Sequence, residues 1–332
     1  MTMRPAYPRA LGWRHLAVLV MAALLLAASA ARMDLGRLAQ QMVTAVLAPT
    51  GLAAGSPETR ALGGMIAQLA PIQLSDRRDV TSIADFDPDR LPPFAYLETT
   101  TETRLELDPD TLVHAQVARR TTWLVQPFGY AWQVAGEMLE TIEIALWGTI
   151  VAIILSLPLA LLGARPLMPQ PIVRNAARSI CAALRAFPEL LSALFLVAAF
   201  GFGPGAGILA LGIHAAGYLG RTFADAIEDA DQRPLQAVQA TGANGLVAFR
   251  MAVLPQVKAP FVSATFYILD RNVRTATVVG LVGAGGIGQE LKGRIDLFEY
   301  GHVGTILIAI LITVLLLDRI AIRLRHRGHA DA

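Results

Sequence analysis

The sequence predicts an all-α polytopic membrane protein with about six transmembrane helices. Hydrophobic residues make up 54% of its 332 residues, and charged residues make up only 16%, well below the roughly 25% of an ordinary soluble domain. Mean hydropathy is +0.50. The third observation is a set of apolar runs close to 20 residues long, the length that crosses a hydrocarbon core of about 30 Å. These runs cover residues 15–31, 139–162, 187–202, 207–223, 261–282 and 304–321.

The first run is compatible with a secretory signal peptide or with an uncleaved membrane anchor. Arg4, Arg9 and Arg14 precede an apolar core that ends in Ala28-Ser29-Ala30, as in a cleaved signal. The run of about 17 residues is long for the apolar part of a signal peptide, which favours an anchor. The single cysteine, Cys181, excludes a disulfide framework within the chain.

The distribution of basic residues predicts the orientation of the spans, because cytoplasmic loops of membrane proteins are enriched in Lys and Arg. With the N-terminus inside, the cytoplasmic segments are 1–14, 163–186, 221–258 and 318–332, which together hold 15 basic residues. The external segment 32–138 has nine basic and thirteen acidic residues, so it is net acidic. We therefore expect both termini to lie in the cytoplasm.

Residues 32–138 form a long polar insert between the first span and the rest of the chain. The acidic, proline-rich stretch at 85–94 indicates turns, and the alternating stretch at 104–108 is compatible with a short strand. Two weakly amphipathic runs, 35–47 and 59–70, are compatible with helices on the membrane surface. The insert is therefore either a partly ordered external loop or a small folded cap.

The long cytoplasmic loop at 224–258 predicts two short helices joined by a bend. Pro234 suits the start of the first helix, and Gly242 interrupts it. A second amphipathic run at 246–253 is expected to end at Pro255. Uncovered apolar side chains on such a small knob indicate a protein partner, with a linker on the membrane surface as the alternative.

Residues 236–255 resemble the E-A-A-x(3)-G…L-P loop of type I ABC importer permeases. The matching positions are Ala237, Gly242, Leu254 and Pro255. The resemblance implies that this loop is the coupling helix, which docks into a groove on the ATPase subunit. Gln236 replaces the usual glutamate of the family, which would alter the polar contacts at that interface.

The stretch DRNVRTATVVGLVGAGGIGQEL at 270–291 is similar to the phosphonate branch of the same family. With the span pattern, the resemblance covers a permease core at 139–322, followed by a cytoplasmic tail at 323–332. It implies a homodimer in the bacterial inner membrane with two ATPase subunits and a periplasmic solute-binding protein. The chain has no G-x-x-x-x-G-K-[ST] motif, so we expect no cofactor on it, and ATP and Mg on the ATPase.

Three charged residues lie in the middle of the fifth apolar run: Asp270, Arg271 and Arg274. Each ionisable group at mid-membrane costs at least about 2.5–3.5 kcal/mol, so such groups face the bundle interior or a water-filled path. In a helix they belong to a polar stripe formed by Ser263, Tyr267, Asp270, Arg271, Arg274 and Thr277. Asp270 and Arg274 have the i,i+4 spacing and the order that favour an ion pair.

That pairing leaves Arg271 without a partner in the sequence, and an unpaired guanidinium beside water attracts oxyanions. The predicted translocation path consists of Tyr267, Asp270, Arg271, Arg274 and Thr277. His214 in the fourth span is interpreted as a hydrogen-bonded packing residue, and Glu189 as an interfacial residue at the inner end of the third span.

The glycines of VVGLVGAGGIGQE at 278–290 match G-x-G-x-x-G, the phosphate-binding pattern of dinucleotide folds. Such folds also need an acidic residue about 20 positions later, and residues 300–317 contain none. Glycines also let helices approach closely and let the backbone bend. We therefore predict an outer gate or hinge made of Gly283, Gly285, Gly286 and Gly288.

These features favour the transmembrane permease subunit of an ABC importer that moves a small oxyanion, phosphonate or phosphite, by alternating access. The chain itself is then a transport subunit and not an enzyme. Two alternatives stay open. An intramembrane enzyme acting on a phosphorylated lipid would need a nucleophile or metal ligands, which the motifs do not provide. A secondary anion transporter would leave the loop at 224–258 unexplained.

Overall fold

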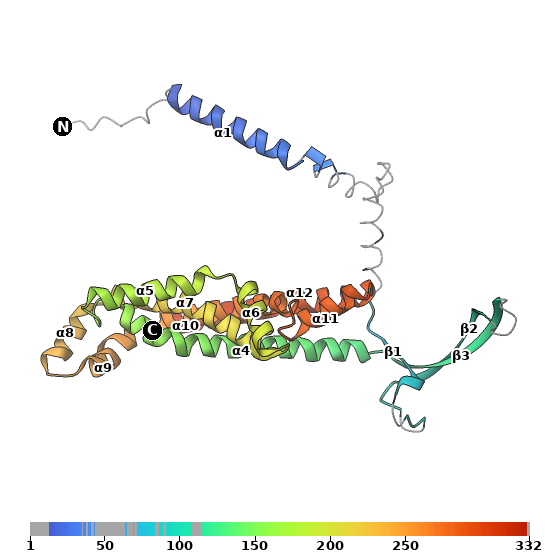
Figure 1. The fold of residues 1–332 in the computed structure, drawn as a ribbon. Coiled ribbons are helices and arrows are strands. Elements are labelled where there is room, and N and C mark those ends of the chain that lie inside the picture. Colours follow the sequence, from blue (N-terminus) through green and yellow to red (C-terminus); the bar gives the residue numbers. More distant parts are fainter. Residues whose placement is uncertain are drawn as a thin grey trace. The chain divides into compact units, whose positions relative to one another are not determined.

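The computed structural model describes residues 13–34, 36–37, 39–40, 43, 64, 69, 72–83, 86–88, 91–107 and 114–330 (Figure 1). The chain divides into two units, Met1–Ala70 and Pro71–Ala332. In the first unit, helix α1 (Trp13–Arg32) covers the first predicted span. Most of the two amphipathic runs expected at 35–47 and 59–70 lies outside the described residues.

The second unit begins with a three-stranded antiparallel sheet of order β1-β3-β2. Strand β1 (Asp76–Asp79) is followed by a short 3-10 helix, η2 (Val80–Ser82). Strands β2 (Tyr96–Leu107) and β3 (His114–Gln126) form a long hairpin that pairs Tyr96 with Val125 and Leu107 with His114. The insert therefore contains a folded sheet, and the expected strand at 104–108 lies in β2 as far as Leu107.

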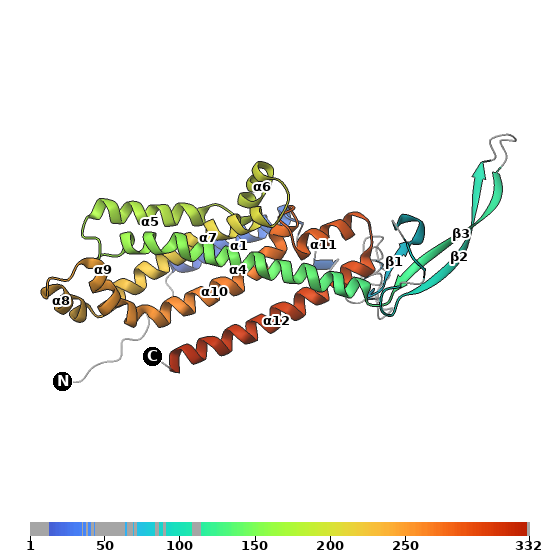
Figure 2. The same ribbon diagram turned by 90° about the horizontal axis from the view of Figure 1, so that it is seen from below.

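The rest of the second unit is an elongated helical bundle (Figure 2). Its helices are α4 (Gly129–Gly163), α5 (Pro171–Ala186), α6 (Glu189–Phe200), α7 (Pro204–Asp229), α8 (Gln232–Ala240), α9 (Gly245–Ala248), the π-helix η3 (Phe249–Val253), α10 (Leu254–Gly280), α11 (Ile287–Asp296) and α12 (Tyr300–Ala330). Helices α8 and α9 lie at one end of the bundle, the knob end. Helix α11 and the sheet lie at the other, the sheet end (Figures 1 and 2).

Helix α7 lies at the centre of the bundle and packs against α4, α5, α6 and α10. Small residues allow this close packing, as in many membrane helix bundles. A Cβ on Gly212 would lie 2.6 Å from Val151 Cγ1 of α4, and one on Gly217 would lie 2.6 Å from the Cys181 carbonyl oxygen of α5.

By length and composition, three helices of the described chain can cross a membrane. They are α4, the continuous stretch Phe249–Gly280, and α12 over Tyr300–Ile320. The pair α5 and α6 would make a fourth span, but it bends by 83° between the two helices. The expected span at 187–202 contains the single helix α6, whose 12 residues are only about 18 Å long and so are shorter than a hydrocarbon core of about 30 Å. Helix α7, which contains the expected span at 207–223, is not among these candidates.

Helix α4 is longer than the apolar run at 139–162 that predicts it. It begins at Gly129 and has 35 residues, about 52 Å, which exceeds a hydrocarbon core of about 30 Å. Its first turn is fixed to the segment just before β1, because the backbone N–H groups of Tyr130 and Ala131 donate to the Leu74 carbonyl oxygen. Helix α4 thus connects the sheet directly to the bundle.

Candidate functional site

The charged residues of α10 form two separate ion pairs in the structure. Arg274 Nη2 donates to Asp270 Oδ2 at 2.6 Å, one turn apart on the same helix. The Asp270 side chain is buried, whereas that of Arg274 is 49% exposed. This confirms the ion pair predicted from the i,i+4 spacing.

The second pair corrects the expectation that Arg271 has no partner. Arg271 Nη2 contacts Glu189 Oε1 of α6 and lies 3.0 Å from His214 Nε2 of α7. His214 Nε2 is also 3.1 Å from the same glutamate oxygen. Glu189 lies 82 residues away in sequence, so only the fold reveals this partner. The three residues are called the Arg271 cluster below.

The break between α5 and α6 places Glu189 in this cluster. Pro188 has an extended backbone and caps α6, so Glu189 is the first residue of that helix. His214 Nδ1 lies 3.1 Å from the Phe187 carbonyl oxygen, which the break leaves without a helical partner. Because a carbonyl oxygen can only accept, Nδ1 donates to it, and this bond fixes the ring with Nε2 against both Arg271 and Glu189. His214 is thus hydrogen-bonded, as expected, and it also orients Arg271.

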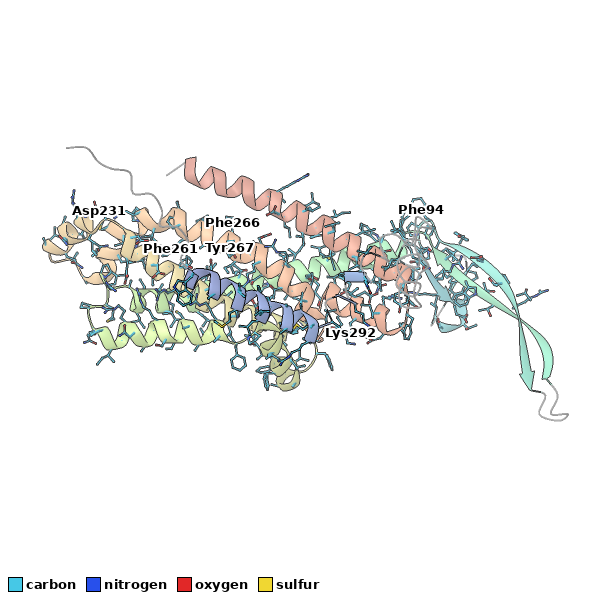
Figure 3. All side chains as sticks on the ribbon, turned by 90° about the horizontal axis from the view of Figure 1, so that it is seen from above. Phe94, Asp231, Phe261, Phe266, Tyr267 and Lys292 are labelled. Atoms are coloured by element: carbon cyan, nitrogen blue, oxygen red, sulfur yellow. The ribbon has the colours of Figure 1, made fainter. Side chains whose placement is uncertain are left out.

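The remaining residues of the polar stripe lie along α10 as predicted from the helical spacing. Tyr267 is 42% exposed, and its ring lies 5.7 Å from that of Tyr218, measured between centroids. Figure 3 labels Tyr267 on α10. Thr277 Oγ1 donates to the Arg274 carbonyl oxygen at 2.6 Å, so this hydroxyl is bound to its own helix. Asn272 lies off the stripe and donates to Thr149 of α4 at 2.9 Å.

The glycine-rich segment forms a tight turn between α10 and α11 at the sheet end. Gly283, Gly285 and Gly286 have φ values of +91°, +85° and +67°, a region that side chains rarely adopt. Gly288 is needed for a different reason, because a Cβ there would lie 2.1 Å from the Thr277 carbonyl oxygen. The turn is held against α4 by two hydrogen bonds, Gly286 N to Glu140 Oε1 at 3.1 Å and Ile287 N to Thr141 Oγ1 at 2.8 Å.

An acidic cavity of about 520 Å³ lies beside this turn. Its lining includes three carboxylates, those of Glu137, Glu140 and Glu290. Like charges repel, so this cavity disfavours a phosphate group, and Glu140 already accepts from the N–H of Gly286. The turn is therefore not a nucleotide cradle.

At the knob end, α8 and α9 form the two short helices expected from the loop. The Asp231 carboxylate caps α8 by accepting from Arg233 N, and Gly242 turns the chain with φ +83°. Leu235 is buried, whereas Gln236 and Ala237 are exposed. Exposed apolar side chains, Val247 at 41%, Met251 at 67% and Leu254 at 38%, complete the surface of the knob.

Pro255 does not end the second helix, which is a further correction. The π-helix η3 continues directly into α10, and Pro255 lies in the first turn of α10. Proline is tolerated there because the first N–H groups of a helix have no partner within it.

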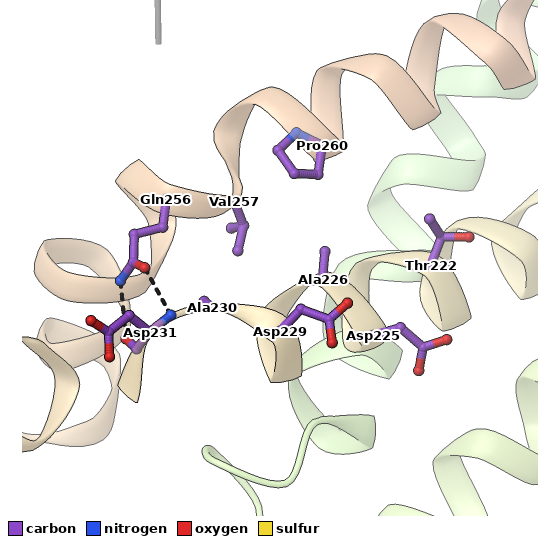
Figure 4. Close-up of a pocket in the computed structure, with 9 residues that line it drawn as sticks. All are labelled: Thr222, Asp225, Ala226, Asp229, Ala230, Asp231, Gln256, Val257 and Pro260. Atoms are coloured by element: carbon purple, nitrogen blue, oxygen red, sulfur yellow. Dashed lines mark hydrogen bonds between the residues drawn. The ribbon is translucent and has the colours of Figure 1, made fainter. Parts of the chain in front are cut away.

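Gln256 joins the knob to α10, a role that the sequence did not indicate. Its amide oxygen accepts from Asp231 N at 2.9 Å, and its amide nitrogen donates to the Asp231 carbonyl oxygen at 3.2 Å (Figure 4). These bonds close one side of a cavity of about 510 Å³ that is also lined by Asp225 and Asp229. The two bonds therefore tie the N-cap residue of α8 to the first turn of α10.

Glu228, at the end of α7, binds both the connection between α4 and α5 and the middle of α5, a role that the sequence did not indicate. Its Oε1 accepts from Arg178 Nη2 at 2.5 Å and from Arg165 N at 2.9 Å. Burial raises the pKa of Glu228, but the Arg165 N–H and the Arg178 guanidinium outweigh it and lower the pKa below its ordinary value.

Comparison with known proteins identifies the family of the helical bundle. The family model of binding-protein-dependent transport system inner membrane components matches residues 125–326. The putative phosphite transport system permease protein HtxE of Stutzerimonas stutzeri is 44% identical over 255 residues, which cover 77% of this chain and 98% of that protein. The phosphate-import permease protein PhnE of Mycolicibacterium smegmatis is 38% identical over 188 residues, or 57% of this chain and 35% of that protein.

Among solved structures, an inward-facing MetNI methionine ABC transporter is similar with a TM-score of 0.53 and 21% identity, over 60% of this chain and 97% of that chain. This likeness shows the fold and confirms the expected permease architecture of the helical bundle. The family match contains the Arg271 cluster, the glycine turn and the knob. The chain belongs to the family of binding-protein-dependent transport system inner membrane components, the membrane permeases of ABC importers.

Proposed function

We propose that this permease carries a small oxyanion, phosphite or phosphonate, through the bacterial inner membrane. The observation that carries this proposal is the Arg271 cluster, a partly exposed guanidinium in the middle of a membrane-spanning helix. An arginine binds oxyanions with several donors in one plane. The relative HtxE, named for phosphite transport, supports this choice of ligand.

Transport by alternating access would use both ends of the bundle. ATP would be hydrolysed with Mg on separate ATPase subunits, two for each homodimer of this permease, and this chain would bind neither. The knob residues Gln236, Ala237, Gly242, Leu254 and Pro255 would form the docking surface for the ATPase. Its exposed apolar side chains suit a protein interface.

The other end of the bundle would face the periplasm, with both termini in the cytoplasm. There a solute-binding protein would deliver the anion, and Gly283, Gly285, Gly286 and Gly288 would form the gate. The anion would then pass along the stripe that contains Tyr267, Asp270, Arg271, Arg274 and Thr277. The acidic cavity at the turn disfavours a resting anion there, which suits a gate better than a binding site.

One experiment tests the proposal as a whole. The permease is co-expressed with an ABC ATPase from the same organism, purified with it, and placed in liposomes with a candidate binding protein. We expect co-purification, and ATP hydrolysis that rises when phosphite or a phosphonate is added together with the binding protein. Anion uptake without ATP or the ATPase would favour a secondary transporter and contradict the proposal.

A further inference from the structure

In the Arg271 cluster, the Glu189 carboxylate is bound to Arg271, whose guanidinium still has N–H donors that bind no described residue. Within the described residues, only Nη2 of Arg271 makes hydrogen bonds, and it makes them to Glu189 and His214. Its Nε and Nη1 groups donate to no described residue. The Arg271 side chain is 30% exposed, so the guanidinium is accessible to a small ligand. Parallel N–H donors that match two oxygens of an oxyanion come from Nε with Nη2 or from Nη1 with Nη2, so an anion gains two such donors where it replaces Glu189 on Nη2.

The charges of this region cancel when no ligand is present. Asp270 balances Arg274, and Glu189 balances Arg271. An oxyanion that enters the same region adds one or two negative charges, and an uncompensated charge inside a membrane is strongly unfavourable. Binding therefore requires either a cation that enters with the anion or the departure of one carboxylate.

Glu189 is the carboxylate that can leave most readily. Asp270 lies in the middle of the 27-residue helix α10, with its side chain 10% exposed. Glu189 is 23% exposed and is the first residue of α6, directly after the 83° break. Of the 12 residues of α6, only Ala193 and Val197 are buried within this chain. Glu189 is therefore held by the cluster itself more than by surrounding packing.

We infer that Arg271, oriented by His214, is an oxyanion-binding site, and that Glu189 is its internal counter-ion, which the transported anion displaces. This inference rests on the proposed function, since it assigns a binding step to the same path. Glu189 then sets the affinity of the path for the transported anion. By competing with the anion it keeps binding weak, so that the anion can be released to the cytoplasm.

The test measures phosphite binding to the purified complex of permease and ATPase, without the binding protein. Glu189→Gln removes the negative charge but keeps an amide oxygen that accepts from Arg271. We expect this variant to bind phosphite about fivefold more tightly than the wild type, the change expected for the loss of one partly exposed ion pair. Arg271→Gln and the double variant Glu189→Gln/Arg271→Gln should both bind phosphite at least fivefold more weakly than the wild type. Asp296→Asn, which removes an exposed carboxylate on α11, is the control and should leave binding unchanged.

The outcomes separate this inference from the proposed function. If the Arg271→Gln variant takes up phosphite normally, the translocation path given in the proposed function is wrong. If Arg271→Gln abolishes uptake while Glu189→Gln binds phosphite like the wild type or more weakly, the counter-ion role alone is wrong. Glu189→Asp keeps the charge on a shorter side chain and should give an intermediate gain. Failure of both Glu189 variants to assemble with the ATPase would show a structural role and would also contradict the inference.

Discussion

Glu140 of α4 accepts a hydrogen bond from the backbone N–H of Gly286 at 3.1 Å, across 146 residues of sequence. This contact and the adjacent bond from Ile287 N to Thr141 Oγ1 hold the glycine turn closed against α4. A gate at this position must break both bonds to open. The relationship leads directly to two predictions on the turn.

The first prediction concerns Gly285. A Cβ at this position would lie 2.7 Å from Glu140 Oε1 and 3.2 Å from Pro204 N, and the residue has φ +85°. Gly285→Val should therefore reduce anion uptake at least about tenfold, because overpacking and backbone strain together cost about 2–4 kcal/mol. Co-purification with the ATPase should be unaffected. Gly293→Ala, where no atom lies within 4 Å of the added Cβ, is the matched control and should transport normally. Normal uptake by Gly285→Val would rule out a gate at this turn.

The second prediction concerns Glu140 itself. Glu140→Ala removes the acceptor of the Gly286 N–H, and a hydrogen bond to a charged group contributes about 1.5–3 kcal/mol. Hydrogen exchange at the Gly286 amide should become at least about tenfold faster, whereas Glu140→Gln, which keeps an oxygen acceptor, should stay closer to the wild type. Equal protection of Gly286 in all three proteins would show that this bond does not hold the turn.

The third prediction separates docking from coupling at the knob. Gln256→Ala removes both bonds to the Asp231 backbone but changes no exposed apolar residue of the knob. We expect normal co-purification with the ATPase and at least about a threefold fall in anion transported per ATP hydrolysed, since each bond contributes about 1 kcal/mol. Gln236→Ala is the contrasting variant, because this exposed residue should affect docking instead. Equal coupling in Gln256→Ala and the wild type would contradict the role of Gln256.

The fourth prediction concerns pH and Glu228. Its pKa is lowered in the folded state, so its contribution to stability is present above the ordinary glutamate pKa of about 4.3 and is lost as the pH falls through the lower folded value. At pH 7.5, Glu228→Gln should lower the Tm by about 2–4 °C, which corresponds to about 1 kcal/mol. At pH 3.5 the difference from the wild type should shrink. A Tm difference that is the same at both pH values would assign the effect to packing instead of charge.

The part of this architecture that follows from local pattern could be predicted from the sequence. Apolar runs identify α4, α10 and α12, and the i,i+4 spacing identifies the Asp270–Arg274 pair. The turn at Gly242 also follows from its sequence, because glycine tolerates φ +83°. Each of these features depends only on residues that lie close together in the sequence.

Features that depend on distant contacts could not be predicted. The Arg271–Glu189 pair needs the 83° break between α5 and α6, and the amphipathic α5 has no apolar run that marks it as a span. Pro255 suggested a helix end because its tolerance in a first turn depends on where the helix starts. Gln256 and Asp231 are 25 residues apart, and nothing in their local sequence links them.

The most direct test of the account is phosphite uptake by Arg271→Gln. The variant is assembled with its ATPase in liposomes, with binding protein and ATP supplied, and is compared with Lys292→Gln, which changes an exposed cation on α11. If Arg271 lines the anion path, uptake by Arg271→Gln should fall at least about tenfold, because a charge-assisted contact contributes about 1.5–3 kcal/mol, while Lys292→Gln should transport normally. Undiminished phosphite uptake by fully assembled Arg271→Gln would contradict the account.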